Sequence, residues 1–157
     1  MRLRRRRLGH HECYLYDIHR TWRKKALLER SIRIPATSDA PRLGRQALDG
    51  WLQGLVGGAR AEDARLIATE LVSNAVRHGS IPADEVITLS LGTSDGTVRI
   101  VVEQPTSTSS ARIAERSDER KGGFGLLLVD RLADAWGVEH GKPGRVWFAI
   151  VGSDPVP

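Results

Sequence analysis

The chain has 157 residues and a formal net charge of +5, with 40% hydrophobic and 27% charged residues. This length and composition are typical of one soluble domain that buries its own core. A single cysteine cannot close an internal disulfide, and no apolar run approaches the ~18 residues of a membrane span. These counts exclude a disulfide-built secreted scaffold and a transmembrane helix, so we expect a cytoplasmic protein without a membrane partner.

The positive charge is concentrated at the N-terminus. Residues 1–30 hold ten Lys or Arg against three Asp or Glu, a net of +7, whereas residues 31–157 hold fourteen against sixteen, a net of −2. We therefore expect a flexible basic extension over 1–30, a folded domain over 31–151 and a short tail over 152–157. Direct binding of nucleic acid ranks last among the functions considered, because the folded part has no basic surplus and no DNA-reading motif.

The first expected elements are a strand and a helix. The alternation in 31–35 predicts a short strand that ends at its proline. Ser38 or Asp39 can cap the helix that follows, and apolar residues recur at helical spacing over 43–55. Gly57-Gly58 is expected to end this helix.

A second helix and a hairpin follow. The helix is predicted from about residue 61 to His78, with Gly79 at its C-terminal end. Two β-rich runs, 86–91 and 97–102, flank a segment that contains Asp-Gly, which is typical of a hairpin turn.

The last part of the domain begins with a long polar segment. Residues 105–123 lack a hydrophobic period and are expected to form one functional loop. A third helix is predicted over 124–135, and two strands over 136–139 and 146–151. The order therefore predicts an α+β fold, a two-layer sandwich whose mixed, mainly antiparallel sheet carries helices on one face.

The second helix carries a carboxylate and a carboxamide on one side. Glu70 and Asn74 are four residues apart, so they share a helix face at the margin of the apolar arc. An Asn side-chain oxygen can bind Mg²⁺, and a Glu can orient or deprotonate a nucleophile. Taken alone, the pair is more often a chance feature of a polar helix edge.

Glycines open the third helix. Gly122, Gly123 and Gly125 surround Phe124, and Lys121 precedes them. Glycines at a helix start let backbone N–H groups approach a phosphate, where the helix dipole adds positive potential. A glycine cluster alone is weak support, since it is also typical of a hinge.

Together these segments resemble the GHKL (Bergerat-fold) ATPase superfamily. The closest likeness is to the stand-alone anti-sigma-factor serine kinases of the RsbW/SpoIIAB type, in particular the actinobacterial ATP-binding protein group. ELVSNAVRHG at 70–79 is similar to their N-box, and GGFGLLLVDRLADAWGV at 122–138 is similar to their G2 box and the segment after it. The resemblance covers about residues 31–151 and implies the Bergerat fold.

The resemblance implies a role for each matching residue. Asn74 would hold Mg²⁺ against the triphosphate of ATP, and Glu70 would be the general base. Residues 106–123 would form the ATP lid. The remaining contacts with the nucleotide would come from the segment Lys121, Gly122, Gly123, Gly125 and Leu126.

One family motif is altered. The family ends the strand before the lid with Asp-x-Gly-x-Gly, whose Asp accepts a hydrogen bond from the adenine amino group. Alternation from Val98 puts Gln104 in that position, and Glu103 takes it if the register slips by one. An uncharged acceptor forms a hydrogen bond weaker by about 1 kcal/mol or somewhat more, or roughly tenfold in affinity. The motifs expected to bind the phosphates therefore match the family, whereas the motif expected to bind the adenine differs from it.

Two functions follow from the resemblance. The first is an ATP-binding regulator that phosphorylates a Ser or Thr of an anti-sigma antagonist and sequesters a sigma factor. The second is a non-catalytic adaptor that keeps the fold and a degenerate nucleotide pocket. Relatives of this type often dimerise, so a homodimer is an expectation by analogy.

Overall fold

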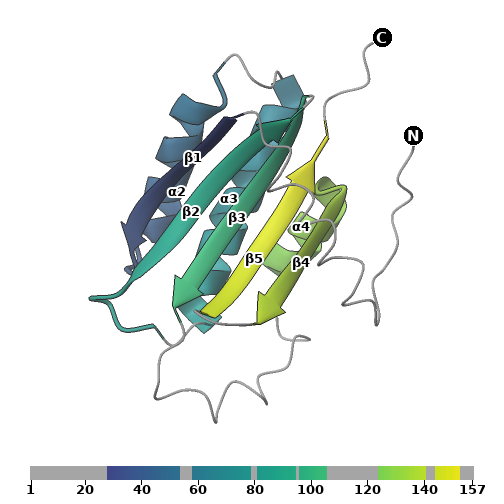
Figure 1. Cartoon of the computed structure of the whole chain (residues 1–157). Helices are drawn as coiled ribbons and strands as arrows, with labels where there is room; N and C mark the ends of the chain where they lie inside the picture. The colour runs from purple at the N-terminus through teal and green to yellow at the C-terminus, as the bar shows by residue number, and fades with distance from the viewer. Residues whose placement is uncertain are drawn as a thin grey trace.

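The computed structural model describes residues 28–53, 58–78, 81–94, 96–105, 124–140 and 144–152. These residues form one five-stranded sheet and three helices, which Figure 1 shows in chain order. The elements are β1 (Leu28–Pro35), α2 (Ala40–Trp51), α3 (Gly58–His78), β2 (Val86–Ser94), β3 (Thr97–Pro105), α4 (Phe124–Leu132), β4 (Ala135–His140) and β5 (Gly144–Val151).

The sheet has the strand order β1-β2-β3-β5-β4, and every pair of neighbours among the described strands is antiparallel. The β2–β3 hairpin lies where the Asp-Gly signal predicts it, and Gly96 has a positive φ of 73° there. β5 is inserted between β3 and β4, so the last of the described strands occupies an interior position of the sheet.

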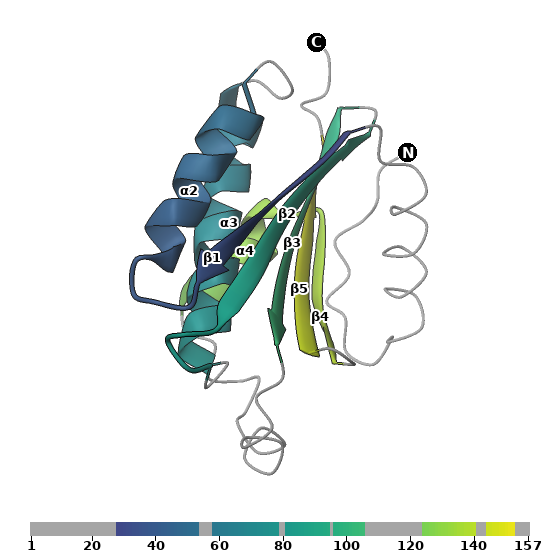
Figure 2. The ribbon, with the colours of Figure 1, turned by 60° about the vertical axis from the view of Figure 1, so that its left-hand side comes forward.

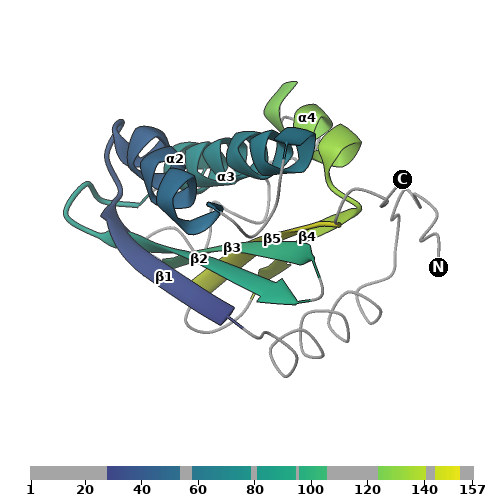
Figure 3. The ribbon, with the colours of Figure 1, turned by 90° about the horizontal axis from the view of Figure 1, so that it is seen from above.

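The helices cover one face of the sheet, as the edge-on view of Figure 2 and the view from above in Figure 3 show. α2 packs over β1 and β2, α3 over β3 and β5, and α4 against α3 and β4. Ile87, Leu89 and Leu91 alternate with more exposed residues along β2 and are fully buried in the core beneath the helices. The predicted two-layer α+β architecture is confirmed.

Close packing and ion pairs join α2 to α3. Gly44 has no side chain at the crossing, and a Cβ there would lie 3.3 Å from Val72 Cγ2. At the surface, the Arg65 guanidinium on α3 donates to the Asp49 carboxylate on α2 at 2.6 Å, and Glu62 accepts from Arg45 at 3.0 Å. These contacts hold α3 in a fixed position over the sheet.

Several predicted boundaries are wrong. α2 ends at Trp51, and Gly58, expected to end that helix, instead begins α3 with a positive φ of 56°. α4 ends at Leu132 because the chain turns there to let Ala135 pair with Ile150 in the sheet. Tertiary pairing overrides the helical pattern at this point.

β1 begins at Leu28, three residues before the predicted strand and inside the predicted basic extension. Residues 1–27, the expected lid over 106–123 and the tail 153–157 lie outside the described residues. No helix in the described part of the chain is both long enough and apolar enough to span a bilayer.

Candidate functional site

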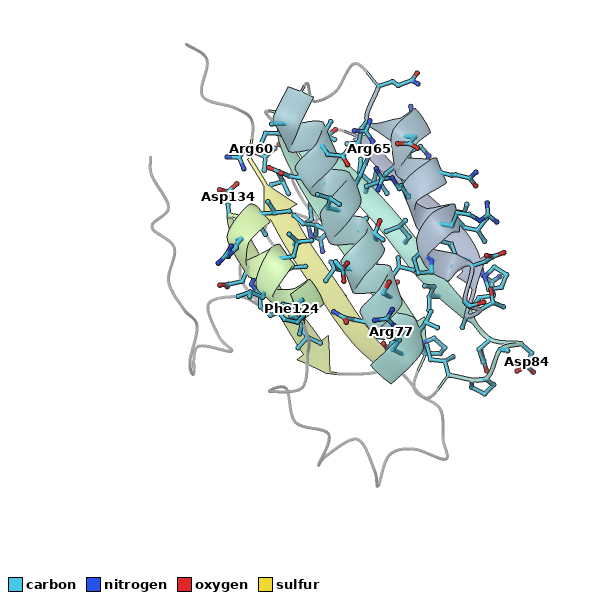
Figure 4. All side chains as sticks on the ribbon, turned by 180° about the vertical axis from the view of Figure 1, so that it is seen from behind. Arg60, Arg65, Arg77, Asp84, Phe124 and Asp134 are labelled. Atoms are coloured by element: carbon cyan, nitrogen blue, oxygen red, sulfur yellow. The ribbon has the colours of Figure 1, made fainter. Side chains whose placement is uncertain are left out.

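The C-terminal ends of two elements and the N-terminal end of a third lie close together on one side of the molecule. In Figure 1, the C-terminal ends of α3 and β3 lie beside the start of β5. Figure 4 shows Arg77 of α3 and Phe124 of α4 at this end, whereas Arg60 and Asp134 lie at the other. α3 and α4 therefore run antiparallel, and the start of α4 faces the C-terminal half of α3.

Three buried polar residues lie toward this end of α3 and β3. Ser73 and Asn74 on α3 and Gln104 on β3 are all buried. Removing a polar side chain from water costs free energy unless a partner replaces the water. Ser94 and Arg99 are buried at the other end of the β2–β3 hairpin, so burial alone does not mark a binding site, and the informative case is a buried polar atom without a partner.

Asn74 is the most informative of these residues. Its side chain is 6% exposed, and its Nδ2 atom is fully buried without a hydrogen-bond partner. An unpartnered buried amide costs about 1–3 kcal/mol, which a bound ligand can recover. Rotating the amide by 180° exchanges its nitrogen and oxygen, so the same position can offer a donor or an acceptor.

Glu70 lies one helical turn before Asn74 and reaches across to α4. A Cβ built on Gly125 would overlap Glu70 Oε2 and lie 3.1 Å from the Glu70 carboxyl carbon. The carboxylate therefore rests on the backbone of the first turn of α4. Because Gly125 has no side chain, the two predicted motifs, N-box and G2 box, are in direct contact.

Gln104 lies on the face predicted for it. Val98, Ile100 and Val102 of β3 are fully buried beneath the helices, and Gln104 continues that alternation at the end of the strand. Glu103 lies on the opposite face. On the neighbouring strand, Gln104 pairs in register with Arg145. The structure therefore places Gln104, and not Glu103, on the face of β3 beneath the helices.

The glycine-rich segment is described in part. Gly125 and Leu126 belong to α4, where Leu126 packs against the core. Phe124 at the start of the helix is 90% exposed. Lys121, Gly122 and Gly123 lie outside the described residues, so their predicted phosphate contacts stay predictions.

Arg77 is a further candidate residue of this site, and the sequence motifs alone do not indicate it. It is exposed at the C-terminal end of α3, seven residues after Glu70 and three after Asn74. Seven residues correspond to almost two full turns, so Arg77 and Glu70 lie on the same side of the helix. This spacing is the signal in the sequence that could have identified it.

The buried Asn74 amide fits a magnesium–phosphate ligand, in which the protein supplies few of the metal ligands. Within the described residues, no group of three or more His, Cys, Asp or Glu side chains could hold a metal ion. Mg²⁺ is commonly held by one or two protein ligands together with substrate phosphates. Asn74 would be the protein ligand in such an arrangement.

Comparison with known families agrees with this geometry. Residues 34–149 match the family of the histidine kinase-like ATPase domain. Because this match spans more than half of the chain, the protein belongs to that family. Membership confirms the GHKL-type fold and supports the coarse expectation of an ATP-binding domain.

A solved structure shares the fold. It is the crystal structure of the RsbU and RsbW domains of Rv1364c from Mycobacterium tuberculosis, with a TM-score of 0.61 and 22% sequence identity. The match covers 80% of the present chain and 32% of the chain in that crystal structure, so the present protein spans about a third of the length of its relative. A search of curated proteins found no match.

Proposed function

We propose that this protein is a Mg-ATP-dependent regulator that transfers the γ-phosphoryl group of ATP to a Ser or Thr of an anti-sigma antagonist and sequesters a sigma factor. The buried, unpartnered Asn74 amide beside the Glu70–Gly125 contact is the observation that carries the nucleotide part. Family membership supports ATP as the ligand. The protein partners rest on the sequence resemblance and on the shared fold.

The proposed chemistry uses few groups of the protein. The acceptor hydroxyl oxygen bonds to the γ-phosphorus, the bond from that phosphorus to the bridging oxygen breaks, and ADP leaves. Glu70 takes the hydroxyl proton, and Asn74 would hold the Mg²⁺. Mg²⁺, when bound, neutralises the charge of the phosphates. Gln104 is the uncharged hydrogen-bonding group proposed to lie near the adenine of ATP.

A second candidate is a non-catalytic adaptor of the same fold. The observation in its favour is Gln104, because the family's Asp would supply a charged acceptor for the adenine amino group at this buried position. An adaptor would bind its partner without measurable affinity for nucleotide.

Thermal unfolding with Mg-ATP separates these functions. At an ATP concentration 100 times its Kd, binding contributes about 2.7 kcal/mol, or a rise in Tm of about 5–10 °C for a domain of this size. We expect this rise for the wild type and none for Asn74→Ala. Gln53→Ala, which removes an exposed carboxamide beyond the end of α2, is the matched control and should respond like the wild type.

The kinase step needs a separate assay. With radiolabelled ATP, the purified protein should label a co-purified antagonist, and Glu70→Ala should suppress labelling without abolishing ATP binding. A wild type that shows no Tm shift at millimolar ATP would rule out the kinase and leave the adaptor.

A further inference from the structure

We propose that the Glu70 carboxylate is an internal anion at the start of α4, and that its charge sets how strongly this site prefers a nucleoside triphosphate to a diphosphate. The inference rests on the proposed function, since it concerns the same nucleotide site. It assigns Glu70 an effect on binding that is separate from any transfer of a proton.

The first step is the position of the carboxylate. Glu70 contacts the backbone at Gly125, within the first turn of the nine-residue α4. The N–H groups of a first helical turn have no acceptor inside the helix and carry about half a positive charge in sum. Glu70 thus puts a negative charge where an anionic ligand of the helix would be stabilised.

The second step is the charge around this carboxylate. No ion pair joins Glu70 to another side chain of the described residues. Seven residues before it on the same side of α3, Asp63 is paired with Arg60 at 3.6 Å. Arg77, seven residues after it, is ~10 Å further along the helix axis. The nearest described cation on this side of α3 is therefore too distant to neutralise Glu70 directly.

The third step is the ligand. The Asn74 amide, buried and unpartnered, is one turn from Glu70, so the two Cβ atoms lie roughly 6 Å apart. A polyphosphate held between Asn74 and the start of α4 must come close to the Glu70 carboxylate. Each added phosphate brings more negative charge, so a triphosphate experiences more repulsion than a diphosphate.

Equilibrium titrations with Mg-ATP and Mg-ADP test the proposal on three variants. Glu70→Gln removes the charge and keeps the shape, and Glu70→Asp keeps the charge on a shorter side chain. Glu85→Gln, on an exposed residue before β2, is the control for net charge. We expect Glu70→Gln to bind Mg-ATP roughly tenfold more tightly than the wild type, with a gain of only about threefold for Mg-ADP, which carries about half the net charge. Glu85→Gln should keep the wild-type ratio, and Glu70→Asp, whose shorter side chain draws the charge back from α4, should lie between the wild type and Glu70→Gln.

The outcomes are distinguishable. If Glu70→Gln binds ATP no more tightly than the wild type, or gains as much for ADP, the inference is overturned while the proposed function stands. A ratio in Glu70→Asp equal to that of Glu70→Gln would also overturn it, because a retained negative charge would then have no effect. If neither the wild type nor Glu70→Gln binds either nucleotide at millimolar concentration, the proposed function and this inference both fail.

Discussion

Gly125→Ala perturbs the contact on which the candidate site depends. The added methyl group would enter the space of the Glu70 carboxylate, whereas nothing lies within 4 Å of the equivalent position on Gly50 of α2. Gly50→Ala is therefore the matched control, because it makes the same replacement in a helix without a new contact.

The magnitude follows from two opposing terms. Replacing glycine by alanine in a helix stabilises by about 1 kcal/mol. Overpacking costs about 1–3 kcal/mol, with the lower end expected here because Glu70 is partly exposed and can turn aside. Gly125→Ala should therefore lower the free energy of unfolding by about 0–2 kcal/mol, whereas Gly50→Ala should raise it by about 1 kcal/mol.

A double-mutant cycle measured by urea unfolding isolates the contact. In a Glu70→Ala background the carboxylate is absent, so Gly125→Ala should become stabilising by about 1 kcal/mol. The coupling energy between positions 70 and 125 should accordingly be about 1–3 kcal/mol. Additivity within about 0.5 kcal/mol would show that the two residues do not touch, and the reasoning about the site would be refuted.

Two further predictions concern the core beneath the site. Asn74→Leu replaces an unpartnered buried amide by an apolar side chain of similar size, so it should raise the free energy of unfolding by about 1–2 kcal/mol. The same substitution should remove the Mg-ATP response. A lower stability in urea would instead mean that the amide is hydrogen-bonded in the free protein. Leu71→Ala removes most of a fully buried side chain and should lower the free energy of unfolding by about 2–5 kcal/mol. The same replacement at the half-exposed Leu127 should lower it by less than about 0.5 kcal/mol. Similar decreases for both variants would contradict the assigned core.

Most of the fold could be predicted because its signals are local. The alternation in 86–91 and 97–102, with Asp-Gly between, specifies the hairpin, and the apolar arc of α3 specifies its buried side. The end of α4 at Leu132 could not be predicted, since it depends on the pairing of Ala135 with the distant Ile150. The insertion of β5 between β3 and β4 likewise has no local signature.

The sequence nominates the residues of the candidate site but not their arrangement in space. Glu70, Asn74 and Gly125 stand out from residue type, spacing and resemblance. The sequence predicts backbone amides at Gly125 for a phosphate, yet the missing side chain also makes room for Glu70. That contact joins residues 55 positions apart, and only the antiparallel packing of α3 and α4 brings them together.

The strand order has a consequence for synthesis of the protein. β5 follows all other described elements in the chain, yet it supplies the partner for both β3 and β4. While the ribosome is still adding residues 144–151, one edge of β3 and both edges of β4 lack a partner among the described strands, and unpaired strand edges are prone to aggregation. The end of β3 that carries Gln104 acquires its neighbour on this side, Arg145, only when β5 emerges.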